Sequence, residues 1–131
     1  MLYSYSCKFT KEHTEATKEK YVLKLASGVI NGIDIYFPQG CCGLVFVHVN
    51  DGLHQIVPVN PDSQLTGSGN LIRFSEDILF DSEPYELQFY GWNVDTEYDH
   101  TIDIKIELHK QSSLLRYIMK SLASLIIFEK E

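Results

Sequence analysis

One segment near the end of the chain constrains the fold more than any other. Between Ile102 and Leu108, aliphatic residues occupy every second position and alternate with Asp103, Lys105 and Glu107. Because successive side chains of a β-strand point to opposite faces, one face of this strand is wholly aliphatic and the other wholly polar. Such a strand covers a hydrophobic core on one side and faces water or a partner on the other. The segment therefore predicts an antiparallel sheet with one buried face.

Strand patterns recur along the rest of the chain. Leu44–Val49 (LVFVHV) is apolar apart from one histidine, which indicates a central strand covered on both faces. The Asn50-Asp51-Gly52 sequence that follows is typical of a tight hairpin turn, so this strand is expected to pair with His54–Val59. The other predicted strands contain Tyr3–Phe9, Tyr21–Leu25, Ile33–Phe37, Leu71–Phe74 and Tyr85–Gly91, and Ile78–Phe80 is a further strand fragment.

These patterns predict an all-β fold. Seven or eight short strands, separated by turns at a spacing of roughly 8–12 residues, are typical of an antiparallel β-sandwich, either jelly-roll or immunoglobulin-like. Helices do not alternate with the strands, which excludes a Rossmann or TIM-barrel arrangement. A chain of 131 residues has room for one such domain, and we expect the sandwich to span residues 1–110.

The periodicity changes after Lys110, and residues 111–131 are predicted to form a C-terminal amphipathic α-helix with Ser112 or Ser113 as its N-cap. Its apolar stripe contains Leu114, Leu115, Ile118, Met119, Leu122, Leu125 and Ile126. The stripe is interrupted by Arg116 and Lys120 and is too short for a transmembrane span. Three placements remain open: packing on the sandwich itself, insertion into another subunit or partner protein, and binding at a membrane surface, which the small number of flanking cations disfavours.

The net charge, the cysteine spacing and the N-terminal residues each argue against one kind of partner, site or location. Eleven Lys and Arg against 18 Asp and Glu give a net charge of −7, which repels nucleic acid and anionic lipid headgroups. Cys7, Cys41 and Cys42 have neither a CxxC nor a zinc-ligand spacing, so we expect buried free thiols. The N-terminal residues lack the pattern of an export signal, so the protein is expected in a cytoplasm or released by lysis.

Two loops carry candidate binding residues. Asn93, Asp95, Glu97 and Asp99 place oxygen-bearing side chains at alternating positions, which suits either a calcium site or a solvated acidic turn; no other cofactor is expected. His100 opens the next strand and is expected to hold this acidic loop by side-chain hydrogen bonds.

The other loop is polar and rich in glycine. Its residues Asn60, Asp62 and Gln64 suit hydrogen bonding to a sugar or another subunit, the alternative being a plain connection. Trp92 follows Gly91 at the end of a predicted strand, where it suits stacking on a sugar, anchoring an interface or covering the core.

No pattern points to catalysis. Cys41 or Cys42 could in principle serve as a nucleophile with His48, His54 or His100 as base, but nothing in their spacing supports this. We therefore expect no enzymatic activity and no catalytic residues.

The stretch Tyr21–Leu108 resembles a group of small structural β-sandwich proteins of phages and archaeal viruses, which decorate or complete a capsid or tail. The residues that carry the resemblance are Gly32–Gly43, His54–Gly69, Leu71–Glu76, Glu83–Asn93, Asp95, Tyr98 and His100–Ile102. It implies a non-enzymatic virion protein, made in the host cytoplasm, that works as a symmetric homo-oligomer with other virion proteins as partners. The alternatives are a carbohydrate-binding module, such as an adhesin tip, and a cellular interaction module.

Overall fold

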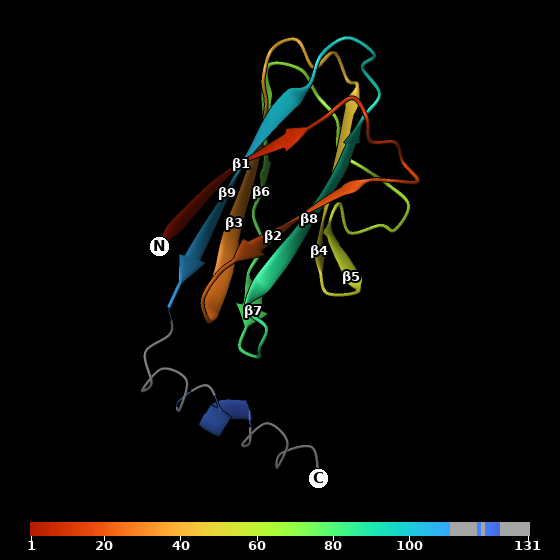
Figure 1. Cartoon of the computed structure of the whole chain (residues 1–131). Helices are drawn as coiled ribbons and strands as arrows, with labels where there is room; N and C mark the ends of the chain where they lie inside the picture. The colour runs from red at the N-terminus through yellow and green to blue at the C-terminus, as the bar shows by residue number, and fades with distance from the viewer. Residues whose placement is uncertain (111–117, 119, 124–131) are drawn as a thin grey trace.

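The computed structural model describes residues 1–110, 118 and 120–123 of the chain. Within these residues, nine β-strands form two antiparallel sheets that pack face to face (Figure 1). The strands are β1 (Leu2–Phe9), β2 (Glu19–Lys24), β3 (Gly28–Phe37), β4 (Val45–Asp51), β5 (His54–Val57), β6 (Asn70–Phe74), β7 (Ile78–Phe80), β8 (Glu86–Asn93) and β9 (His100–His109). The predicted all-β sandwich is confirmed.

The strand order identifies the sandwich as a jelly roll. The first sheet has the order β1-β9-β3-β6, with β7 also paired to β3, and the second has the order β2-β8-β4-β5. The pairs are nested in sequence: β4 with β5, β3 with β6 and β7, β2 with β8, and β1 with β9. The chain is thus one long antiparallel hairpin, turning at Gly52, whose arms wrap around the core. Of the two predicted sandwich types, this order selects the jelly roll.

The predicted count of seven or eight strands is too low by at least one, because the fragment Ile78–Phe80 forms a strand of its own, β7. β6 pairs with the Ile33–Phe37 half of β3 and β7 pairs with its Gly28–Ile30 half. The register of β3 against β9 shifts at Asn31, between these halves, as in a β-bulge. β6 and β7 therefore occupy together the place of one long strand.

The core confirms the predicted faces of the strands. The aliphatic side chains of β9, from Ile102 to Leu108, are completely buried, while Asp103, Lys105 and Glu107 lie on the outer face of the first sheet. The second sheet contributes Leu23, Val45, Val47, Val49, Leu87 and Phe89 to the same core. Tyr5 and Tyr21 donate hydrogen bonds from their hydroxyl groups to the carbonyl oxygens of Lys24 and Lys8, and so fasten β1 to β2 where the two sheets meet.

The described part of the C-terminal segment, residues 118 and 120–123, is helical. Ile118 and Leu122 are 44% and 54% exposed, so these two stripe residues are not buried against the sandwich. The other predicted stripe residues, Leu114, Leu115, Met119, Leu125 and Ile126, lie outside the described residues. In the part of the chain that the structure describes, no helix has the length and apolarity needed to cross a membrane.

One close contact joins β1 to the second sheet. The ring of Phe9 lies against Gly91 of β8, and it meets Phe89 edge-on with the ring centroids 5.6 Å apart. A Cβ atom on Gly91 would come within 2.6 Å of Phe9 Cε1 and 2.9 Å of the Phe46 carbonyl oxygen. Gly91 is therefore a packing position inside the strand, and β8 continues through Asn93 rather than ending at Gly91 as the sequence suggested.

Replacing Gly91 by alanine should lower the free energy of unfolding by about 1–3 kcal/mol, the usual cost of overpacking a core. The Phe46 carbonyl belongs to the backbone of β4 and cannot move away without shifting the strand. Gly32→Ala is the matched control, because the nearest atom to its new Cβ, in Glu107, would be 3.6 Å away. We expect Gly32→Ala to change stability by less than about 0.5 kcal/mol in urea unfolding, and equal losses in both variants would contradict this packing.

Candidate functional site

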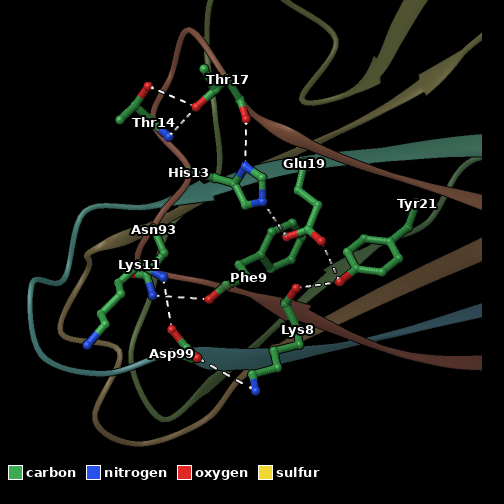
Figure 2. A network of polar contacts seen from close by, with 10 residues as sticks. All are labelled: Lys8, Phe9, Lys11, His13, Thr14, Thr17, Glu19, Tyr21, Asn93 and Asp99. Carbon is green, nitrogen blue, oxygen red and sulfur yellow. Dashed lines mark hydrogen bonds and ion pairs between the residues drawn. The ribbon is translucent and has the colours of Figure 1, made fainter.

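The acidic loop after β8 is built around the buried side chain of Asn93, which is 1% exposed. Its Nδ2 donates hydrogen bonds to the carbonyl oxygens of Phe9 (3.1 Å) and Tyr98 (2.9 Å), and its Oδ1 accepts from the Asp95 N–H (2.9 Å). Figure 2 shows Asn93 beside Phe9 at this end of the sandwich. The amide therefore joins the end of β1 to the loop, and both of its polar atoms are used by the backbone.

Asp95 organises the middle of the loop. Its Oδ1 accepts hydrogen bonds from the Glu97 N–H (2.9 Å) and the Tyr98 N–H (3.3 Å), and its Oδ2 lies 2.8 Å from His100 Nε2. The predicted role of His100 in holding the loop is confirmed. The hydrogen bond from the Glu97 backbone N–H is the largest cause that lowers the pKa of Asp95 below its usual range, and the hydrogen bond with the His100 side chain is the next largest.

Asp99 connects the acidic loop to the segment that follows β1. Its Oδ1 accepts a hydrogen bond from the Lys11 N–H at 2.9 Å, and its Oδ2 lies 3.6 Å from Lys8 Nζ (Figure 2). The backbone hydrogen bond from Lys11 is the main cause that lowers the pKa of Asp99. Glu97, the remaining residue of the predicted calcium set, is exposed, and its carboxylate has no partner in the described part of the chain.

The structure therefore uses Asn93, Asp95 and Asp99 to stabilise the loop. Among the residues that the structure describes, no three His, Cys, Asp or Glu side chains are grouped so that they could hold a metal ion. A calcium site at this loop stays a prediction. The hydrogen bonds of Asn93, Asp95 and Asp99 by themselves give a role to the alternating oxygen-bearing side chains.

The charged segment between β1 and β2 contains a hydrogen-bonded turn. The Thr14 N–H donates to Thr17 Oγ1 at 3.0 Å, and His13 Nδ1 lies 2.9 Å from the Thr17 carbonyl oxygen (Figure 2). The other ring nitrogen of His13 is 3.7 Å from Glu19, at the start of β2. The segment is thus closed by its own side chains and leads directly to Lys18.

Four rings line the outer face of the second sheet, and we call them the aromatic row: Phe46, His48, Tyr90 and Trp92. Phe46 stacks on Trp92 with centroids 5.4 Å apart, and His48 stacks on Tyr90 at 5.0 Å. Each stacked pair joins directly opposite residues of β4 and β8. Lys18 Nζ lies 5.6 Å from the Tyr90 centroid and 5.9 Å from the Trp92 centroid, within range of a cation–π interaction.

Trp92 lies on the outer side of its sheet, since its neighbour Gly91 faces Phe9 in the core. The indole is only 5% exposed and lies outside the cluster of core residues. Phe46 stacks on it and Lys18 approaches its ring. Trp92 is thus a buried member of the aromatic row on the outer side of the sheet, a position that differs from a cover over the core.

His48 is held in one tautomer by its two partners. Its Nε2 lies 3.4 Å from Lys18 Nζ, and its Nδ1 lies 2.8 Å from Asn50 Oδ1. An ammonium group can only donate, so Nε2 must accept and Nδ1 carries the hydrogen that is donated to Asn50. Burial is the main cause that lowers the pKa of His48; the Lys18 charge adds to this, and the Asn50 hydrogen bond opposes it. The imidazole is therefore neutral at pH 7.

A groove of about 660 Å³ runs beside the aromatic row, and we call it the β5 groove. Its lining residues come from three parts of the chain: Glu15 and Lys18, which we call one wall; the loop from Val59 to Gln64, which we call the other wall; and β4 and β5 with the turn between them, which we call the floor. Asp62 and Gln64, both predicted as binding residues, line it.

Asn60 instead serves the loop itself, donating to Ser63 Oγ at 2.6 Å. Sequence reasoning missed Lys18, because a lysine in a segment without apolar periodicity gives no sign of the strand it will cover.

The two buried cysteines are not activated as nucleophiles. Cys7 and Cys41 are buried free thiols, as predicted, whereas Cys42 is exposed. Burial raises the pKa of Cys7 to about 12 and also raises that of Cys41. Both buried thiols therefore stay protonated at neutral pH and are poor nucleophiles.

Comparison of the chain with protein-family models, with curated proteins and with solved structures gives no match.

Asp95→Asn should lower the melting temperature at pH 7, because the neutral amide replaces a carboxylate that accepts three hydrogen bonds. Since folding lowers the pKa of Asp95 below its usual 3.8, its contribution is complete above pH 3.8 and is lost as the pH falls through the lowered value. The difference between wild type and variant should therefore shrink in acid. Glu97→Gln is the control and should melt like the wild type, whereas equal effects of both variants would contradict the network.

Folding lowers the pKa of His48 below 6.5, so stability should fall as the pH drops from 6.5 through the lowered value. An imidazolium would face the Lys18 ammonium group. Lys18→Met keeps the apolar stem and removes the charge, so it should raise the pKa of His48 toward, but not to, 6.5, because burial remains. NMR titration of the imidazole measures the shift, and Lys20→Met on the same sheet is the control. An unchanged pKa in Lys18→Met would show that the two groups do not interact.

Proposed function

We propose that the protein is a non-enzymatic structural component of a virus particle, which works as a symmetric oligomer through protein–protein contacts. In this proposal it is a capsid-decoration, minor capsid or tail accessory protein, made in the host cytoplasm and incorporated into the virion. The observation that carries the proposal is the jelly-roll strand order, β1-β9-β3-β6 against β2-β8-β4-β5, because capsid subunits are a major class of proteins with this architecture.

A fold alone hosts many functions, so the apolar residues outside the core also bear on the choice. Ile118 and Leu122 are four positions apart on a helix, so they project from the same side. Both are about half exposed. Each large aliphatic side chain contributes roughly 1.5–3 kcal/mol when it is transferred completely from water into a contact. A partner that covers this side of the helix would gain that free energy, which favours attachment in trans.

The outer face of the first sheet is less suited to assembly. Three of its charged groups already have partners within the sheet: Arg73 Nε lies 3.2 Å from Asp34 Oδ1, and Asp103 accepts a hydrogen bond from Ser6 Oγ at 2.6 Å. Burying such groups in an interface would cost desolvation free energy without supplying new partners. The proposal therefore assigns the subunit contact to the C-terminal helix rather than to this sheet.

The proposal is tested by the mass of the full chain in solution. Multi-angle light scattering should show one discrete assembly larger than the 15.0 kDa monomer. The double variant Ile118→Ser and Leu122→Ser should give a smaller species, because it removes the apolar contact, and should keep the melting temperature of the sandwich, because both residues are already exposed. Ser121→Ala, on the same helical turn, is the control and should leave the mass unchanged.

A monomer at every concentration would contradict the proposed oligomer. An assembly whose mass survives the double variant would instead contradict the assignment of the helix as the contact.

A further inference from the structure

The β5 groove contains polar side chains that the fold does not use. Glu15, His54, Asp62 and Gln64 line it, and in the described part of the chain none of these side chains makes a hydrogen bond or an ion pair. They differ in this respect from the acidic loop, where Asp95 and Asp99 are engaged by the backbone. The groove therefore presents unused acceptors and donors from both of its walls.

The walls are fixed to the floor, so the groove is formed in advance of any ligand. The amide nitrogen of Gln55, on β5, lies within hydrogen-bond distance of the carbonyl oxygens of Pro58 (2.7 Å), Asn60 (3.1 Å) and Ser63 (2.9 Å). On the opposite wall, the contact of Lys18 with His48 ties the charged segment to β4. A preformed site loses less conformational entropy when it binds.

Two apolar residues that line the groove are highly exposed. Leu53, at the tip of the β4–β5 hairpin, is 99% exposed, and Val59 is 74% exposed. Both line the groove together with Ile56 and Pro61. The surface thus combines aliphatic patches with unpaired polar groups, and its volume falls in the ~300–1,000 Å³ range of small-molecule sites.

This combination matches the chemistry of a sugar. A sugar hydroxyl both donates and accepts, so it can donate to the carboxylates of Glu15 and Asp62 and exchange both kinds of hydrogen bond with the Gln64 amide. The C–H faces of a sugar ring are apolar and fit against aliphatic side chains such as Val59. The two carboxylates disfavour a phosphate-bearing ligand, because both would repel its negative charge.

We propose that the β5 groove is a saccharide-binding site, in which Glu15, Asp62 and Gln64 bind ring hydroxyls and Leu53 and Val59 contact the apolar face of the sugar. The site belongs to a single protomer and does not depend on the oligomer proposed above. It differs from the sugar site suggested by the sequence, since Trp92 is covered and Asn60 is used by its own loop.

The test is binding of the full chain to an array of neutral and acidic oligosaccharides, followed by NMR titration with the best-bound saccharide in free form. We expect saturable binding that shifts the resonances of groove residues. Asp62→Asn should weaken the affinity about tenfold or more, which corresponds to losing one charge-assisted hydrogen bond. Asp62 has a φ of 68°, in the left-handed region that asparagine also adopts, so this substitution keeps the loop conformation.

Glu107→Gln is the matched control, because it makes the same change in charge at an exposed carboxylate on the outer face of the other sheet. It should bind saccharide like the wild type, and both variants should keep the wild-type mass. The proposal is overturned if no saccharide binds at millimolar concentration, or if Asp62→Asn binds as tightly as the wild type. A change in mass caused by Asp62→Asn would also overturn it and would make the groove a contact between protein chains.

Discussion

The pairing of β9 with both β1 and β3 is the interaction on which the rest of the structure depends. β9 lies between them in the first sheet, and its aliphatic side chains from Ile102 to Leu108 are completely buried. Since β1 is the first strand and β9 the last, the sandwich closes only when the two ends of the strand-forming region meet. The Met1 ammonium group, which donates to the Leu108 carbonyl oxygen at 2.6 Å, extends this pairing to the first residue. Every other pair of strands is nested inside this one.

The sequence predicts those parts of the fold that depend on local periodicity. The faces of β9 and the β4–β5 hairpin at Gly52 follow from alternation and turn chemistry, and both are observed. The choice of jelly roll over immunoglobulin-like topology depends instead on which distant strands pair, and alternation carries no information about that. The end of β8 differs from the prediction for a related reason. Gly91 looks like a strand terminator in the sequence, and only the position of Phe9 explains why a glycine is needed there.

In the candidate sites, too, some features follow from the local sequence and others depend on residues that are distant along the chain. The alternation of oxygen-bearing residues from Asn93 to Asp99 is equally suited to binding a cation and to accepting backbone N–H groups, because both need an inward-pointing oxygen atom. The direction of the backbone decides between them, and here N–H groups of Asp95, Glu97 and Tyr98 point at the side-chain oxygens. The groove residues Asp62 and Gln64 could be selected by their polarity alone. Their convergence with Glu15 and Lys18 could not, since the two walls are far apart in sequence.

The charged segment between β1 and β2 connects the acidic loop to the groove. At one end, the backbone N–H of Lys11 donates to Asp99, and at the other Lys18 lies over the aromatic row. The exposed ion pair of Lys8 with Asp99 is 3.6 Å long and adds little, because solvent and salt screen it. The position of the Glu15 wall therefore depends on a backbone hydrogen bond, on the turn closed by Thr14 and Thr17, and on a lysine whose partners are a neutral imidazole and aromatic rings. A segment without large apolar side chains is thus held by contacts that salt screens only weakly. Any ligand that enters the groove therefore meets a wall that is anchored at both ends.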